Sequence, residues 1–367
     1  MVEQTYIPEM IWTRRELHRR PELGWREFRT TERIVKTVRS LGFDTVLGLK
    51  LFNTDYTFGR EPEAIRNACN QALRDGMHGY TGCLAVFDTG RPGPVTAFRF
   101  DIDCVAVEEE KTDNNEAWAQ GFTSEMCGLM HACGHDGHTA VGLTLARWIH
   151  DHADSLCGRI KLIFQPAEEG TKGAAGIAYS HNLDDVDYFV GAHLGVKARL
   201  HEVGIVRSGF LSTTKYNVRF HGVAAHSGSC AQLGRNALMA ACNAAVQIMG
   251  IPRHGQGNTN VNVGVVRAGE GRNIVAAHAF MELEVRGEDT EINRYMEDSA
   301  KRMLAGCAQS YGVQHEVEIA GMATSVVSDK PLCDLIGQIA RMTDGVERVF
   351  DIEACPGSED CSLLMQA

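Results

Sequence analysis

The sequence predicts an α/β protein with a central, mostly parallel mixed sheet and a separate α+β insertion. In its first half, three apolar runs of strand character alternate with helical runs, which is typical of a parallel or mixed sheet. Near Ser208 the pattern changes to the order β-α-β-β-α-β, which is that of a ferredoxin-like unit. We therefore expect a main domain in two parts, 1–209 and 323–367, around an inserted domain at 210–322.

Length and composition narrow the class of protein. The 367 residues are enough for two domains with substantial cores. The net charge of −11 argues against nucleic acid or an anionic membrane as the main partner. No apolar run approaches the roughly 20 residues of a membrane span, and no signal-peptide core is visible. Apart from Cys133, the cysteines form no CxxC pair and are best explained as buried, reduced thiols of a cytoplasmic protein.

The N-terminal part predicts helices that will pack on the sheet. A helix pair is expected between Ile11 and Leu41, broken at Pro21 because proline cannot continue a helix. The segment Leu49 to Met77 is polar and partly helical and looks inserted. We assign no chemistry to that segment.

Each of the three strand-like runs ends in polar residues. The run 94–100 is followed by Asp101 and Asp103, the run 159–164 by Glu168 and Glu169, and the run 187–190 by His193. Ligands of α/β sheets bind beyond the carboxyl ends of the strands. We therefore expect one edge of the sheet to gather Asp103, Cys133, His135, Glu168, Glu169 and His193.

The densest group of reactive side chains is the run HACGHDGH, from His131 to His138. Cys133 and His135 are two residues apart, and a thiolate with an imidazole suits a borderline metal such as zinc. Apolar residues at spacings of three and four then predict an amphipathic helix, with one face formed by Val141, Leu145, Trp148 and Ile149. The cluster would thus lie at a helix N-terminus, where the dipole favours a thiolate. A polar loop before a core helix is the alternative.

Adjacent carboxylates after a strand suit a hydrolytic metal site. One carboxylate can bind metal while the other takes a proton from water, as Glu168 and Glu169 could. Two metals about 3.5–4 Å apart need a bridging ligand, for which Cys133 and Asp103 are candidates. A solvated acidic turn would explain the glutamate pair taken alone. In the same chain as HACGHDGH, the catalytic interpretation is preferred.

The later elements follow from alternation and helical spacing. Strands are expected at 213–220, 260–266, 279–286 and 314–319, and helices at 236–251, 293–311 and 331–342. An acidic turn containing PGSED comes next, followed by the start of a further helix, CSLLMQA.

Motifs along almost the whole chain resemble a known family. LHRRPELGWRE, FRFDID, HACGHDGH, FQPAEEG, GAHLG, AAHSG, VNVGVVRAGEGRNIV and PGSED occur in the order found in the metal-dependent aminoacylase, hippurate hydrolase and indole-acetyl-amino-acid hydrolase family. The resemblance implies a zinc-peptidase-like catalytic domain and a dimerisation or lid role for the inserted domain. The segment 49–77, with DTGRPGPV and DDVDYF, is most similar to the branch that cleaves p-aminobenzoyl-glutamate, a folate breakdown product. Another N-acyl or N-aroyl amino acid is the alternative substrate.

The resemblance also implies roles for individual residues. The metal ligands would be Cys133, as the bridge, with His135, Glu169 and His193, holding two divalent ions, Mn²⁺ or Zn²⁺. Glu168 would be the general base, and Asp103 would orient a histidine ligand. His226, in AAHSG, would help to hold the scissile carbonyl, often across a dimer interface.

Two further residues are weaker candidates for substrate contacts. Arg286 could pair with a substrate carboxylate, although a surface charge on a strand explains it equally well. Asn262 is the other candidate. Asp101 stands where related dizinc peptidases carry a ligand histidine, so we do not expect it to bind metal.

One departure from the family concerns the last metal ligand. The family carries a further ligand histidine after the GSED-type turn, and no such segment follows Ala367. We therefore expect weak metal loading and weak activity, because affinity falls with ligand count. The expected partners are a small N-acyl amino acid and, through the inserted domain, either an identical or a homologous second subunit, with no nucleic acid and no membrane. A non-catalytic partner subunit with an incomplete site is the alternative from another functional class.

Overall fold

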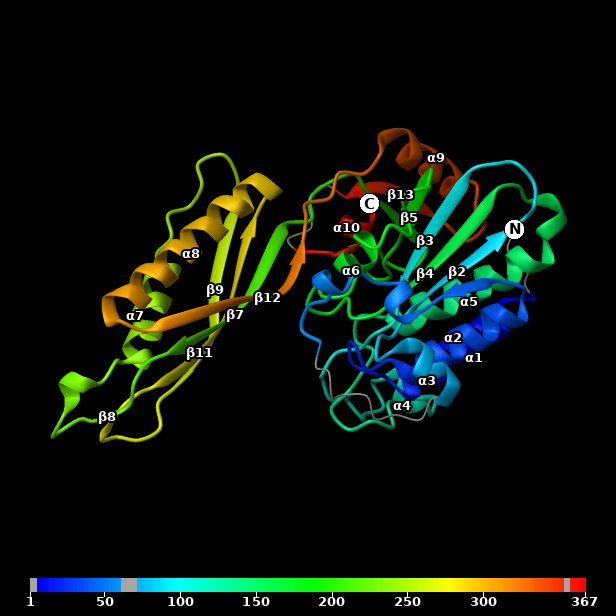
Figure 1. Cartoon of the computed structure of the whole chain (residues 1–367). Coiled ribbons are helices and arrows are strands. Elements are labelled where there is room, and N and C mark those ends of the chain that lie inside the picture. The colour runs from blue at the N-terminus through cyan, green and yellow to red at the C-terminus, as the bar shows by residue number, and fades with distance from the viewer. Residues whose placement is uncertain (1–4, 61–70, 353–356) are drawn as a thin grey trace. The chain divides into compact units, whose positions relative to one another are not determined.

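The protein folds into two compact units. The structure, a computed structural model, describes residues 5–60, 71–352 and 357–367. The first unit comprises the described residues of Met1–Ile205, Lys330–Ile352 and Asp360–Ala367, and the second comprises those of Val206–Asp329 and Glu353–Glu359. Each unit has its own principal sheet (Figure 1).

The first unit is built on a five-stranded mixed sheet with the order β1-β2-β4-β3-β5. Its strands are β1 (Asp44–Val46), β2 (Cys83–Asp88), β3 (Val95–Asp101), β4 (Arg159–Gln165) and β5 (Tyr188–Gly191). The three predicted strands, β3, β4 and β5, are present and run parallel. The sheet is less parallel than expected, because β2 pairs antiparallel with both β1 and β4. The short connection from β2 to β3 requires this reversal, since parallel strands need a long crossover.

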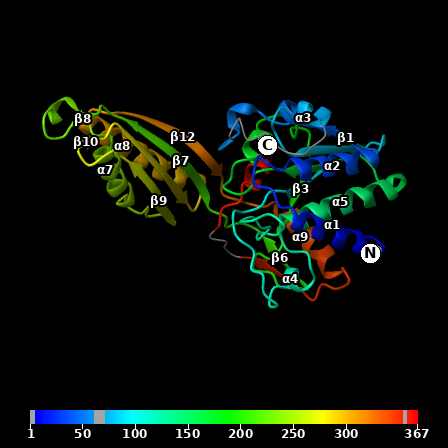
Figure 2. The same ribbon diagram turned by 90° about the horizontal axis from the view of Figure 1, so that it is seen from below.

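Helices cover one side of this sheet. In Figures 1 and 2 they lie together, and they are α1 (Ile7–Arg19), α2 (Phe28–Ser40) and α5 (His135–Asp151). Both α2 and α5 pack on the sheet, and α1 packs on α5. The break between α1 and α2 falls just before Pro21, as predicted. Ile34 and Val38 of α2 are fully buried and pack in one cluster with Phe100 of β3.

The buried face of α5 differs in part from the predicted one. Ile149 is buried as predicted, and Leu145 and Trp148 are partly buried against the core. Val141 is exposed, whereas Leu143 and Ala146 are buried. The helix approaches the sheet most closely at Gly142, where a Cβ atom would lie 2.7 Å from ring carbons of both Phe100 and Phe164. A hydrophobicity pattern gives little weight to glycine and alanine, and here these small residues set the contact face.

The remaining elements of the first unit are short, except for the 12-residue α9. They are α3 (Gln71–Met77), α4 (Glu116–Ala119), α6 (Ala174–Ala178), α9 (Lys330–Arg341), α10 (Cys361–Leu364), the 3₁₀ turns η1 (Gly48–Lys50), η2 (Thr54–Tyr56) and η3 (Ala153–Ser155), and the pair β6 (Glu202–Val206) with β13 (Arg348–Ile352). Part of the predicted insertion at 49–77, namely 61–70, lies outside the described residues. None of the described helices is long and apolar enough to cross a membrane.

The second unit has a four-stranded antiparallel sheet and two helices. Its main elements in chain order are β7 (Ser212–His221), α7 (Ala237–Met249), β9 (Thr259–Ala268), β11 (His278–Gly287), α8 (Thr290–Tyr311) and β12 (Gln314–Ala323). The sheet order is β12-β7-β11-β9. A small ribbon of β8 (Ala225–His226) and β10 (Ile274–Val275) lies at one end of the unit, with the turn η4 (Ala231–Leu233) beside β8 (Figure 2).

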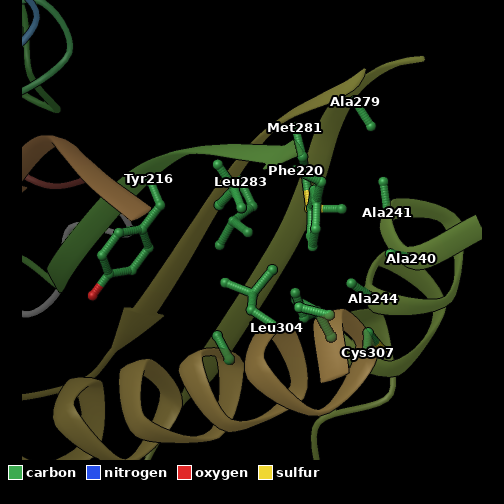
Figure 3. Close-up of a cluster of buried hydrophobic side chains, with 14 of the residues drawn as sticks. Tyr216, Phe220, Ala240, Ala241, Ala244, Ala279, Met281, Leu283, Leu304 and Cys307 are labelled. Carbon is green, nitrogen blue, oxygen red and sulfur yellow. The ribbon is translucent and has the colours of Figure 1, made fainter. Parts of the chain in front are cut away.

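Side chains from both helices and the sheet form the core of the second unit. Figure 3 shows Ala240, Ala241 and Ala244 of α7 facing the same space as Leu304 of α8 and Met281 of β11. Because alanine is small, α7 can lie close to the sheet and to α8. The opposite face of α7 does not contribute to this core.

The close approach at Gly142 gives a stability prediction. We expect Gly142→Ala to lower the free energy of unfolding by about 1–3 kcal/mol, because the added methyl group overpacks the core. Gly306→Ala in α8 is the control, since nothing lies within 4 Å of its Cβ position. It should be neutral or raise the free energy by about 0.5–1 kcal/mol. Urea denaturation followed by circular dichroism measures both, and an unchanged Gly142→Ala midpoint would show that α5 can move away from the sheet.

Candidate metal centre

Residues that follow β3 and β4 meet the start of α5 at one edge of the first unit's sheet. β3 and β4 end side by side, with Asp101 paired to Gln165. Just beyond them, the carboxylate of Asp103 accepts a hydrogen bond from the backbone N–H of Glu169 (2.9 Å). The same carboxylate lies 3.3 Å from Nδ1 of His135. Three segments far apart in the sequence thus converge, as expected for the carboxyl ends of parallel strands.

Cys133, His135 and Glu169 form a tight group of potential ligands. One ligand atom of each lies within 4.8 Å of the others. Cys133 and His135 flank Gly134, whose φ of 88° places it in the left-handed region at the N-cap of α5, where glycine is favoured. His193 joins the group through Nε2, which lies 3.4 Å from Sγ of Cys133. The structure therefore brings together the four side chains expected to bind metal.

The hydrogen bonds of His135 leave one ring nitrogen for a ligand. Nδ1 lies 3.0 Å from the backbone carbonyl of Asp103, so it carries the hydrogen and donates it. Nε2 is buried and has no hydrogen-bond partner among the described residues. This is the arrangement of a metal-binding histidine, whose other nitrogen donates to a carbonyl or carboxylate. The orphaned Nε2 and the sulfur, nitrogen and oxygen donors fit a divalent ion such as Zn²⁺ or Mn²⁺.

The charges of the cluster also favour a cation. Although burial alone would lower it, the carboxylates of Asp101 and Asp103 raise the pKa of His135 to about 12. The neighbouring imidazoles of His135 and His193 lower the pKa of the Cys133 thiol. Burial, and then the charge of Asp103, raises the pKa of Glu169. The site thus holds more negative charge than its own imidazoles easily balance, and a bound cation would neutralise it.

Asp101 lies within ligand distance of His135, His138 and His193, and it also has partners within the chain. Its Oδ2 accepts a hydrogen bond from Nη1 of Arg99 (2.6 Å), and its Oδ1 accepts one from His138. Nη2 of Arg99 also contacts Asp360 (3.2 Å). Although burial would raise it, the Arg99 guanidinium and the neighbouring imidazoles hold the pKa of Asp101 far below its usual value. Asp101 is therefore a buried, fully paired carboxylate.

Glu168 lies in a loop whose backbone is fixed by Glu27, the residue that precedes α2. The preceding residue, Ala167, has a φ of 52°, which is unfavourable for a residue with a side chain. Its backbone N–H donates to Oε1 of Glu27 (2.8 Å), and Thr81 donates to Oε2 of the same carboxyl group. Burial, and then the charge of Asp103, raises the pKa of Glu27 well above its usual value. Sequence reasoning missed Glu27, because nothing local links it to the loop.

A second buried cluster lies behind the HACGHDGH run. His18 lies between two carboxylates, with Nδ1 2.8 Å from Asp136 and Nε2 3.0 Å from Glu109. Arg14 also contacts Asp136 (2.8 Å). Although burial lowers it, the hydrogen bond and charge of Asp136 give His18 a raised pKa. This cluster joins α1 to the first turn of α5.

His131 does not join the metal group. It is buried beside His18, with their ring centroids 6.4 Å apart, and neither of its ring nitrogens has a hydrogen-bond partner among the described residues. Burial lowers the pKa of His131 to about 4. Of the run from His131 to His138, Cys133 and His135 group with Glu169, while His135 and His138 group with Asp101 and His193.

Comparison with known proteins gives the family. The family model described as peptidase family M20/M25/M40 matches residues 97–367, a range that holds all four potential ligands. The chain belongs to this family. As an M20 peptidase it is a metal-dependent hydrolase, in agreement with the ligand cluster.

Relatives of this M20 chain are similar over nearly its whole length. It is 43% identical to a Haemophilus influenzae homolog of a p-aminobenzoyl-glutamate hydrolase subunit, over 98% of this chain and 87% of the relative. It is 42% identical to an indole-3-acetyl-aspartic acid hydrolase of Enterobacter agglomerans, over 98% of this chain and 85% of that protein. A solved structure of an aminobenzoyl-glutamate utilization protein from Klebsiella pneumoniae aligns with a TM-score of 0.87 at 36% identity, covering 99% of this chain and 88% of that one.

The remaining site candidates of the M20 chain belong to the second unit. His226 lies on β8, and its Nδ1 accepts a hydrogen bond from the backbone N–H of Gly228 (3.1 Å). Arg286 of β11 pairs with Glu284 two residues earlier on the same strand (3.1 Å). Asn262 is exposed on β9 and lies opposite Glu284 in the strand register. The structure leaves the functional roles of these three residues as predictions.

The raised pKa of Glu27 gives a pH prediction for the M20 chain. The folded protein keeps a proton that the unfolded chain releases, so its stability declines as pH rises above the unfolded pKa of about 4.3. Glu27→Gln keeps an acceptor for Ala167 and a partner for Thr81 without the charge. We expect its stability relative to the unmodified protein to increase from about pH 5 to about pH 8, as measured by thermal unfolding in a chelator.

The matched control for this prediction is Glu27→Leu. Leucine is similar in size and also uncharged, but it leaves the Ala167 N–H without a partner, so we expect Glu27→Leu to be less stable than Glu27→Gln by about 1–3 kcal/mol at every pH. Identical pH profiles for Glu27→Gln and the unmodified protein would mean that Glu27 is ionised in the fold.

Proposed function

We propose that this chain hydrolyses the amide bond of p-aminobenzoyl-glutamate, releasing p-aminobenzoate and glutamate. The observation that carries the proposal is the cluster of Cys133, His135, Glu169 and His193 with Glu168 next to it in sequence. The substrate comes from relatives, because the names of the Haemophilus protein and the Klebsiella structure refer to aminobenzoyl-glutamate.

Four side chains would hold the metal. Cys133 would be the shared ligand of two divalent ions, Mn²⁺ or Zn²⁺, with His135, Glu169 and His193 as the other protein ligands. When bound, such ions lower the pKa of a water molecule toward ~7 and polarise a carbonyl oxygen. A mixed set of sulfur, nitrogen and oxygen donors accepts either metal, so availability decides between them.

The residues around the ligands would orient the reactants and move the proton. Glu168 takes a proton from the attacking water and returns it to the leaving nitrogen. Asp103 keeps His135 in the tautomer that donates through Nδ1, as its 3.0 Å contact indicates. His226 of the second unit donates to the carbonyl oxygen as negative charge develops on it. Asn262 and Arg286 contact the rest of the substrate, with the arginine on a carboxylate.

The alternative substrate class is another N-acyl amino acid. The Enterobacter relative is named for indole-3-acetyl-aspartic acid, and its identity to this chain is almost the same as that of the Haemophilus protein. Both named substrates are amides of an acidic amino acid with an aromatic acyl group. Overall identity therefore does not separate them, and the acyl group must be tested directly.

The second unit is proposed to be the inserted ferredoxin-like dimerisation or lid domain. Its β-α-β-β-α-β order and antiparallel sheet support this assignment. The side of α7 opposite its core alanines carries an exposed apolar stripe of Met239, Cys242, Val246 and Met249. β9 forms one edge of the sheet beside α7. An apolar stripe next to an open edge is typical of an interface between subunits, either identical or homologous.

The proposed location is the cytoplasm. Every cysteine among residues 5–60, 71–352 and 357–367 is a free thiol. Reduced cysteines are the usual state in a reducing compartment.

The catalytic proposal is tested with variants of the glutamate pair. We expect Glu168→Gln to lower p-aminobenzoyl-glutamate hydrolysis by about 100-fold or more with metal content unchanged, because it removes the base but no ligand. Glu169→Gln should lose metal as well as activity. Elemental analysis and glutamate release on the same preparations measure both, and the exposed Glu347→Gln is the control.

Each outcome of this experiment has a defined meaning. Loss of metal in Glu168→Gln would make Glu168 a ligand. Turnover of indole-3-acetyl-aspartate without p-aminobenzoyl-glutamate hydrolysis would favour the alternative substrate. A metal-loaded chain that hydrolyses neither would favour the non-catalytic subunit.

The interface proposal is tested by placing a charge on the apolar stripe. Val246 is 75% exposed, and we expect Val246→Glu to convert a dimer into a monomer in sedimentation experiments because the charge would be buried at the interface. Leu200→Glu is the control, since Leu200 is 85% exposed on the first unit and should leave the mass unchanged. A Val246→Glu protein that remains dimeric would place the interface elsewhere.

A further inference from the structure

Both ring nitrogens of His138 are occupied within the chain. Nδ1 is hydrogen-bonded to Oδ1 of Asp101. Nε2 accepts a hydrogen bond from the backbone N–H of Leu194 (2.8 Å). Because Nε2 accepts, the hydrogen of the neutral ring is on Nδ1, which donates it to Asp101. His138 therefore has no lone pair left for a metal, although its ring lies among Asp101, His135 and His193 within ligand distance.

Leu194, whose N–H binds His138, also binds His193 through its carbonyl group. The carbonyl oxygen of Leu194 accepts a hydrogen bond from Nδ1 of His193 (2.7 Å). With the hydrogen on Nδ1, the lone pair of His193 is on Nε2, the atom that lies 3.4 Å from Sγ of Cys133. The backbone of Leu194, through the peptide groups on both sides of its Cα atom, thus connects His138 to the orientation of His193.

The side chain of Leu194 independently places the same loop on α5. A Cβ atom at Gly137 would lie 2.7 Å from Cδ1 of Leu194, so the leucine packs directly on the first turn of the helix. At the other end of the chain of contacts, the Arg99 guanidinium holds Asp101 at 2.6 Å. The series of contacts therefore begins at the buried Arg99–Asp101 ion pair on β3, passes through His138 and ends at Leu194 in the loop after β5.

We propose that His138 is a positioning residue, which anchors the Leu194 peptide to Asp101 and thereby aims Nε2 of His193 at the metal site. The proposal rests on the proposed metal site, and it assigns His138 no ligand role of its own. Two variants separate its two hydrogen bonds. His138→Asn keeps a donor for Asp101 but cannot reach Leu194, and His138→Gln can offer an oxygen to the Leu194 N–H.

The first test measures metal affinity by chelator competition with Zn²⁺ and no substrate. We expect His138→Asn to weaken binding by about 10- to 100-fold, as for other residues that orient a ligand. His138→Gln should be weakened less. His150→Asn, at the far end of α5, is the control and should bind Zn²⁺ normally. Circular dichroism checks that each variant is folded, and an unchanged affinity in folded His138→Asn would overturn the proposal.

The second test separates positioning from coordination. In histidine-labelled protein, the ¹⁵N shifts of His138 should show the Nδ1–H tautomer both without metal and with saturating Zn²⁺, while the Nε2 shift of His193 moves. At saturating Co²⁺, His138→Gln should give the same absorption spectrum as the unmodified protein. A metal-induced shift at His138 Nε2, or an altered Co²⁺ spectrum, would make His138 a ligand and overturn the proposal. Neither test uses substrate, so failure to cleave p-aminobenzoyl-glutamate would disprove the proposed function without affecting this result.

Discussion

Buried negative charge at the end of β3 is the constraint on which the first unit depends. Asp101 and Asp103 are both completely buried, and a carboxylate without partners would be very unstable there. The chain compensates each one differently. Arg99 and His138 pair with Asp101, while the Glu169 N–H and the His135 ring bind Asp103. The same hydrogen bonds that satisfy these carboxylates orient the potential ligands, so stability and ligand geometry have one source.

The segment between α1 and α2 supports this arrangement. The side chain of Glu27 accepts a hydrogen bond from the backbone N–H of Ala167. The backbone carbonyl of Glu22 accepts one from the N–H of Cys104 (2.9 Å). A Cβ atom at Gly24 would lie 3.0 Å from Ala167, so the N-terminal segment packs against the glutamate loop. The loop that contains Glu168 is thus held in place by residues 22–27, which have no proposed catalytic role.

Much of this organisation could be predicted from sequence, because it follows from local patterns. The alternation of apolar runs located β3, β4 and β5, and their polar ends located the site. Cys133, His135, Glu169 and His193 were recognised by residue type and motif. The prediction was wrong where packing decides, as on α5, where Gly142 rather than Val141 faces the sheet. It was silent on Glu27 and on the hydrogen bonds of His138, because these depend on contacts between distant segments.

The Arg99–Asp360 pair also has a consequence for the order of biosynthesis. Its two residues are 261 positions apart in the chain, with the whole second unit between them. Contacts of such separation form late, because their loop-closure entropy must first be overcome. Domains fold largely from the N-terminus as the ribosome releases them. The charge balance around Asp101 is therefore completed only after the second unit has left the ribosome, and we expect metal loading to follow chain completion rather than to start folding.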